Sequence, residues 1–191
     1  MTQPLDIVGL CGSLRKGSLN RMALRLAGEL MPPSMKLDIV DWRELPPFDA
    51  DLLAAGMPAP VGALRERIAR ADGVLFATPE YNFGLPGMLK NAIDWVSRGA
   101  DQPFAMKPVA VLSATPGPLG GARVQYELRK ALQYLHAMVM VKPEVFIGMA
   151  DGKFDAQGHC TDETTRKFVT EQMRAFEPWI AAVRRMGSAT G

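Results

Sequence analysis

The chain has 191 residues, a length that suits one domain with a sizeable core of its own. Apolar residues make up 48% and charged residues 22%, which excludes a disordered, collagen-like or disulfide-scaffold protein. Lys and Arg total 22 against 20 Asp and Glu, so the net charge of +2 gives no support for nucleic acid as a partner.

The two cysteines, Cys11 and Cys160, are too few for a disulfide framework or a cysteine metal site, and they suit a reducing compartment. The N-terminus lacks the basic and apolar regions of a signal peptide. No apolar run approaches the roughly 20 residues that span a bilayer. We therefore expect a cytoplasmic protein with no membrane segment.

The first half of the chain alternates predicted strands and helices. Residues 5–11 and 36–41 are short apolar runs rich in branched side chains, which predicts buried strands. Apolar residues at helical spacing predict helices over 19–31 and 61–71. Between them, residues 42–60 are rich in Pro, Asp and Ala without clean periodicity, which predicts a long loop.

The second half continues the alternation. The predicted strands are 73–78, 107–114 and a fifth within 139–147, where Pro143 interrupts the pattern. The predicted helices run from Pro86 to about Arg98, over 121–136, and over 161–186, the last as one helix or as a helix pair divided at Pro178.

This alternation predicts βαβ units and a parallel sheet with right-handed crossovers. Five strands predict a single α/β domain over residues 1–191, with the three-layer flavodoxin-like fold and strand order 2-1-3-4-5. In such a sheet a ligand binds beyond the carboxyl ends of the strands, at the point where the strand order reverses. The loops after the first, third and fourth strands therefore matter most.

The first loop, residues 12–20 (GSLRKGSLN), combines two glycines with hydroxyl and amide side chains and Arg15. Together with the free N–H groups of the following helix, these residues predict a phosphate site at a helix N-terminus. The alternative is an ordinary helix start capped by Ser18. Ser18 stands where a Walker A loop needs lysine, and no dinucleotide glycine pattern is present, so a phosphate monoester of a mononucleotide is favoured.

The second loop, residues 78–87 (TPEYNFGLPG), holds two aromatic rings between prolines that fix the backbone. Gly84 and Gly87 would allow close approach or a positive φ. This pattern predicts a site for a flat heteroaromatic ring, the alternative being a structural loop with buried aromatics. The third loop, residues 115–121 (TPGPLGG), would let a ligand lie against its backbone.

The three loops, with residues 86–95 (PGMLKNAIDW) and 120–126 (GGARVQY), resemble the NAD(P)H-dependent FMN reductase family. The closer similarity is to its quinone and chromate reductase branch, near the azoreductases. The resemblance implies non-covalently bound FMN, NAD(P)H as co-substrate, and a dimer or tetramer. It also implies a cofactor site made of Ser13, Arg15, Ser18, Leu19 and Asn20 around the phosphate, Pro79, Glu80, Tyr81, Asn82 and Phe83 around the flavin ring and ribityl chain, and Thr115 and Gly117 from the third loop.

Members of that branch have an Arg, a Tyr and a Glu near the subunit contact, which match Arg123, Tyr126 and Glu144. The alternative for Arg123 and Glu144 is a solvated surface. A tyrosine often occupies the position of Phe83 in those members, so a hydrogen bond from that hydroxyl is absent here.

The resemblance implies a ping-pong cycle in which FMN does the chemistry, so we expect no catalytic side chain and no metal. Small-molecule acceptors such as quinones, chromate, azo or nitro compounds would take the electrons. The alternatives are a flavodoxin-type electron carrier, which the near-neutral charge disfavours, and a reductase that supplies reduced FMN to an oxygenase. The sequence does not identify the acceptor, the preferred nucleotide or the role of residues 42–60.

Overall fold

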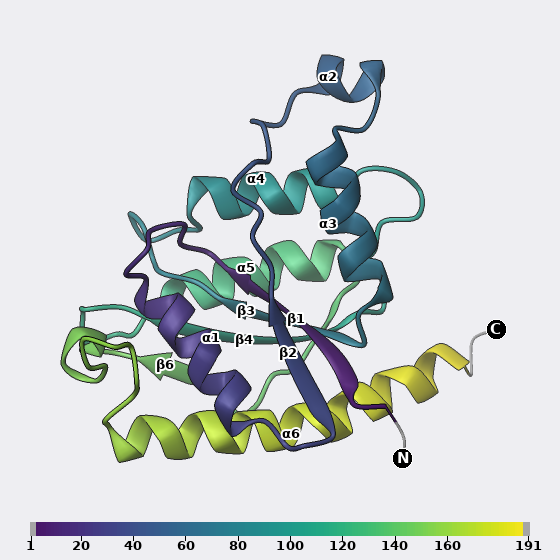
Figure 1. The fold of residues 1–191 in the computed structure, drawn as a ribbon. Helices are drawn as coiled ribbons and strands as arrows, with labels where there is room; N and C mark the ends of the chain where they lie inside the picture. Colours follow the sequence, from purple (N-terminus) through teal and green to yellow (C-terminus); the bar gives the residue numbers. More distant parts are fainter. Residues whose placement is uncertain (1–2, 189–191) are drawn as a thin grey trace.

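The computed structural model describes residues 3–188 and contains one parallel sheet. The strands are β1 (Leu5–Cys11), β2 (Met35–Ile39), β3 (Gly73–Ala77), β4 (Pro108–Ala114), β5 (Met138–Val139) and β6 (Val145–Ile147). β1 pairs in parallel with both β2 and β3, and the path β2-β1-β3-β4-β5 confirms the expected order (Figure 1). The order therefore reverses between β1 and β3.

The single fifth strand expected within 139–147 is wrong, because two short strands take its place. β5 pairs with the beginning of β4 and β6 pairs with its end. Pro143 lies between them and has no N–H to give to a ladder. The side-chain amide of Gln172 fills the gap, since its Nε2 donates to the carbonyl oxygens of Val111 and Pro143, both at 3.0 Å.

Helices cover both faces of the sheet and make three layers (Figure 1). On one face, α1 (Leu19–Leu30) and α6 (Glu163–Ser188) pack over the strands and enclose one apolar core. On the other face, α3 (Ala59–Arg70), α4 (Gly87–Val96) and α5 (Ala122–Tyr134) enclose a second one. The three-layer α/β architecture is as expected.

The C-terminal helix α6 continues through Pro178, so of the two forms expected for residues 161–186 the structure has the single helix. A proline in a helix removes one backbone hydrogen bond and costs roughly 3 kcal/mol. Phe176 and Ile180 flank Pro178, and both side chains are fully buried against the sheet. Each contributes roughly 1.5–3 kcal/mol of burial, so packing on both sides of the proline outweighs its cost.

Residues 42–60 are not a plain loop, because they contain the short helix α2 (Ala50–Ala55). Asp49 caps it, its carboxylate accepting from the backbone N–H groups of Asp51 and Leu52. No residue of α2 is buried, and the helix stands out from the body above α3 and α4 (Figure 1). Because α2 is stabilised by its N-cap and buries no apolar face, its sequence has no helical periodicity of apolar residues.

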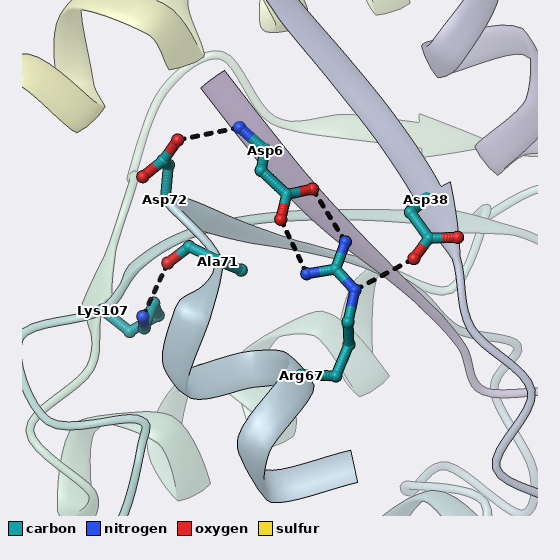
Figure 2. Close-up of polar contacts among 6 residues, drawn as sticks. All are labelled: Asp6, Asp38, Arg67, Ala71, Asp72 and Lys107. Atoms are coloured by element: carbon teal, nitrogen blue, oxygen red, sulfur yellow. Dashed lines mark hydrogen bonds and ion pairs between the residues drawn. The ribbon is translucent and has the colours of Figure 1, made fainter. Parts of the chain in front are cut away.

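A polar cluster fastens α3 to the sheet (Figure 2). The guanidinium of Arg67 donates to both carboxylate oxygens of Asp6, at 2.8 and 2.7 Å, and to Asp38 at 3.0 Å. Nearby, Lys107 donates to the carbonyl oxygens of Ala69 and Ala71 at the end of α3, and its burial lowers its pKa. α3 is thus held to the sheet through its last turn and its carboxyl end.

No helix within residues 3–188 combines the length and the apolar character needed to cross a bilayer.

Candidate functional site

The first loop leaves β1 where the strand order reverses. The N–H of Gly12 donates to the carbonyl oxygen of Ala77 at the end of β3, at 2.7 Å. A Cβ on Gly12 would lie 2.5 Å from the Oγ1 of Thr78, the first residue of the second loop. Only glycine fits at position 12, because any larger residue would place its Cβ against the side chain of Thr78. The first residues of the first and second loops are therefore in direct contact.

Ser18 is the N-cap of α1, as the alternative interpretation of the first loop proposed, and its hydroxyl accepts from the N–H of Arg21 at 3.3 Å. Arg15 is exposed. Ser13 is only 5% exposed, yet its hydroxyl has no hydrogen-bond partner among residues 3–188. Because the first N–H groups of a helix also lack intrahelical partners, the loop offers an arginine, a spare hydroxyl and free amides at a positive helix end. This is a donor set for a phosphate.

The side chain of Asn20 joins the first loop to the third. Its Oδ1 accepts from the N–H of Ala114 at 2.9 Å and its Nδ2 donates to the Ala114 carbonyl at 2.8 Å. Asn20 is almost fully buried, and Ala114 is the residue before the third loop. The side chain thus acts as a brace between α1 and the end of β4.

The thiol of Cys11 lies beneath the first loop, where it donates to the carbonyl oxygen of Ser13 at 3.2 Å. Cys160 is also buried, and burial raises its pKa. A raised pKa disfavours the thiolate, the reactive form, so the structure gives Cys160 no nucleophilic character.

The second loop contains a tight hairpin. Tyr81 and Gly84 exchange backbone hydrogen bonds at 3.2 and 2.9 Å, and the two residues between them, Asn82 and Phe83, have φ of 49° and 65°. Two positive φ values identify a type I′ turn, which usually takes Asn and Gly. The expectation that Gly84 or Gly87 would supply a positive φ is wrong. The positive φ values belong to Asn82 and Phe83, so the backbone strain of the turn falls on Phe83.

Glu80 ties this hairpin to α5. Its carboxylate accepts from the Nε of Arg123 at 2.6 Å and from the N–H of Val124 at 3.2 Å, in the first turn of the helix. The Arg123 guanidinium also lies 3.8 Å from the centre of the Phe83 ring, a cation–π contact. The Glu80 side chain is 8% exposed, so it is a buried helix cap supplied by another loop.

The third loop packs on the segment that follows β6. Gly120 and Gly121 have positive φ, and a Cβ on Gly120 would meet the backbone of Phe146 at 2.7 Å. The N–H groups of Met149 and Ala150 donate to the carbonyl oxygens of Gly117 and Thr115. This support was missed from sequence, although Gly148, where a Cβ would collide with the carbonyl oxygen of Pro118, was a signal of close approach.

A cavity of about 320 Å³ opens where the second and third loops meet. Its lining includes Glu80, Thr115 and Gly117, three of the residues expected to bind the cofactor, together with Arg123. Pro79 is buried behind it, whereas Tyr81, Asn82 and Phe83 are exposed on the hairpin. Ser13, Arg15, Ser18, Leu19 and Asn20 gather at the start of α1. Contacts of Gly12, Asn20 and Glu80 join the three loops to one another and to α5, although no residue of the first loop lines the cavity.

The three residues expected at a subunit contact lie on and beside α5. Arg123 is held by Glu80, and the phenol ring of Tyr126 is exposed with its centre 6.3 Å from that of Phe146. Glu144 pairs with Lys142 at 2.5 Å, and this ammonium, with the hydroxyl of Tyr126, lowers the pKa of Glu144.

Comparison with known proteins identifies the family. The model of the NADPH-dependent FMN reductase family matches residues 5–152. The chain is 44% identical over 184 residues to NAD(P)H-dependent FMN reductase PA1204 of Pseudomonas aeruginosa, covering 96% of this chain and all of that protein. It is 46% identical over 187 residues to the quinone reductase of Escherichia coli K12, with the same coverage. FerB, a flavoenzyme NAD(P)H:(acceptor) oxidoreductase from Paracoccus denitrificans, superposes with a TM-score of 0.85 at 36% identity, covering 93% of this chain and 98% of that one. The chain therefore belongs to the NADPH-dependent FMN reductase family.

Proposed function

We propose that this protein is an FMN-dependent oxidoreductase, built as a single flavodoxin-like domain, that takes hydride from NAD(P)H and passes electrons to quinones or similar acceptors. The observation that carries the proposal is that direct contacts join three loops at the reversal of strand order, the first of which holds a phosphate donor set. The named activities of PA1204, the E. coli quinone reductase and FerB support it.

The residues present fit FMN. The spare hydroxyl of Ser13, the cation of Arg15 and the amides of Leu19 and Asn20 match the oxygens of a phosphate monoester. Thr115 and Gly117 line the cavity beside the third loop, and the hairpin of Tyr81, Asn82 and Phe83 would flank the ring system. When bound, FMN supplies the capacity to accept a hydride and to release its electrons to an acceptor.

The protein's own contribution is position. Asn20 through buried hydrogen bonds, and Glu80 through bonds to the first turn of α5, hold the loops in place before a ligand arrives. Both substrates would use the same open face beside the exposed hairpin in turn, which gives ping-pong kinetics. Quinones are the acceptor class that the relatives' names favour, and we propose chromate, azo and nitro compounds as further acceptors at the same open face.

We further propose that the protein forms a dimer or tetramer through Arg123, Tyr126 and Glu144. The exposed ring of Tyr126 next to Phe146 offers an apolar contact, flanked by the charges of the other two residues. Sedimentation of Tyr126→Asp against the parent protein tests this contact, which is refuted if both have the same mass. Because its two cysteines are free and buried, we place the protein in the cytoplasm.

The test of the function begins with the visible spectrum of the purified protein. We expect a yellow protein that oxidises NADH or NADPH with 1,4-benzoquinone and gives parallel lines in double-reciprocal plots. A colourless protein that cannot be reconstituted with FMN would refute the proposal. An electron carrier would stay idle without a separate reductase, and a supplier of reduced FMN would lose its flavin on a desalting column run during turnover.

Arg15→Gln tests the phosphate site, with Lys16→Gln as its matched control, because the two cations are adjacent and both exposed. Loss of a charge-assisted contact of roughly 1.5–3 kcal/mol should weaken FMN binding by about 10- to 150-fold for Arg15→Gln alone. Equal effects of the two variants would mean that general positive charge, not a contact by Arg15, attracts the cofactor.

A further inference from the structure

The three tryptophans differ in what their indole N–H groups do. The Nε1 of Trp95 donates to the carbonyl oxygen of Pro46, and the Nε1 of Trp179 to that of Met138, both at 2.8 Å. Trp42 is only 3% exposed, yet its N–H has no acceptor among residues 3–188. The N–H of a mostly buried tryptophan usually finds a partner, so the open donor of Trp42 marks a place where an acceptor can bind.

Trp42 lines a cavity of about 590 Å³, distant in sequence from the three ligand loops. Its walls are the segment that follows β2, residues 40–45, and the side of α3 that carries Ala63 and Leu64. None of the residues proposed to bind FMN lines it. A volume of this size lies within the roughly 300–1,000 Å³ typical of small-molecule sites.

The unpartnered N–H is accessible rather than sealed in the core. The fully buried side-chain atoms without a partner belong to Gln125, Arg129 and Gln172 within the described part of the chain, and Trp42 is not among them. Trp42 also lines a small void surrounded by apolar side chains such as Leu10 and Phe76. Of these two spaces only the large cavity has room for a ligand, so we take the indole N–H to face it.

The charges around the cavity exclude an anion as its ligand. Arg67 is fully engaged by Asp6 and Asp38, as Figure 2 shows, and the Nε of Arg43 donates to both oxygens of Asp41. Glu44 adds a further carboxylate to the lining. The cavity thus combines apolar walls, one neutral donor and no cation that lacks an acidic neighbour.

We propose that this cavity is a second binding site, for an uncharged flat ring compound whose carbonyl oxygen or ring nitrogen accepts the hydrogen bond of Trp42. The ring would lie against Leu45 and Leu64, both buried parts of the same core as Trp42. The site does not depend on the proposed redox function, because it shares no residue with the three loops.

The test uses ¹⁵N-labelled full-length protein saturated with FMN, in which the three indole N–H resonances are internal controls for one another. The probe is coumarin, an uncharged flat ring with a carbonyl acceptor, and naphthalene is the matched ring without one. We expect coumarin to shift the Trp42 indole resonance to saturation while those of Trp95 and Trp179 stay in place. Naphthalene should bind about fivefold more weakly, since it loses one hydrogen bond.

Ala63→Phe fills the cavity from the exposed side of α3 and should abolish the shift while keeping Trp42. Ala69→Phe is its control, because Ala69 is an exposed alanine of the same helix that does not line the cavity. The proposal is overturned if the Trp42 resonance does not move up to the solubility limit of coumarin. It is equally overturned if the shift persists in Ala63→Phe or if naphthalene binds as tightly as coumarin.

Discussion

Glu80→Gln should destabilise the protein by about 2 kcal/mol, although it removes no atom from the core. The variant keeps the size of the side chain and one acceptor oxygen but loses the charge that faces Arg123 and the N-terminus of α5. A charge-assisted hydrogen bond contributes roughly 1 kcal/mol more than a neutral one, and a charge at a helix N-terminus contributes roughly 0.3–1 kcal/mol.

The magnitude has an upper bound, because the Arg123 side chain is 45% exposed. When Glu80 loses its charge, the guanidinium can turn into water, so the penalty of roughly 3–5 kcal/mol for a stranded buried charge does not apply. In a chain of this length, a loss of about 2 kcal/mol lowers the Tm by about 4–8 °C.

Urea unfolding of the flavin-free protein, followed by circular dichroism, measures the change as a lower midpoint at constant slope. Glu127→Gln is the matched control, since Glu127 is on the same helix and pairs with Lys130 only at 3.7 Å on the surface. The control should stay within about 0.5 kcal/mol of the parent. If both variants unfold at the same urea concentration, Glu80 does not stabilise the junction between the second loop and α5.

Three further changes test other parts of the structure. Asn20→Ala removes both hydrogen bonds to Ala114 and should cost about 2–4 kcal/mol in urea unfolding, whereas a change below 1 kcal/mol would show that the brace is dispensable. Gly12→Ala forces a Cβ against a buried side chain of the second loop and should cost about 1–3 kcal/mol; Gly62→Ala, where a Cβ meets nothing within 4 Å inside a helix, should instead stabilise by about 0.5–1 kcal/mol. The pKa of Glu144 is lowered by the neighbouring lysine ammonium, so its contribution to stability is complete above the unfolded pKa of about 4.3 and is lost as the pH falls below it. Glu144→Gln should therefore lose less stability than the parent between pH 6 and pH 3, and parallel pH profiles would contradict the assignment.

Strand and helix periodicity in the sequence was sufficient to predict the α/β class, the strand order and the three loops at one edge of the sheet. These features depend on short-range rules, namely apolar spacing, glycine and proline at turns, and the fixed hand of βαβ crossovers. The donor set of the first loop is likewise local, because Ser13, Arg15 and the start of α1 are within a few residues of one another.

The tertiary structure alone decided how the site is held together. Asn20 bonds a residue 94 positions away and Glu80 caps a helix 44 positions away, and no local pattern contains such pairings. The division of the fifth strand depends on Pro143 meeting Gln172 from α6, and the continuity of α6 depends on burial around Pro178. Each of these outcomes depends on whether a contact with a residue distant in sequence outweighs the local energetic cost. Such a contact forms only in the folded chain, so no local sequence pattern reveals it.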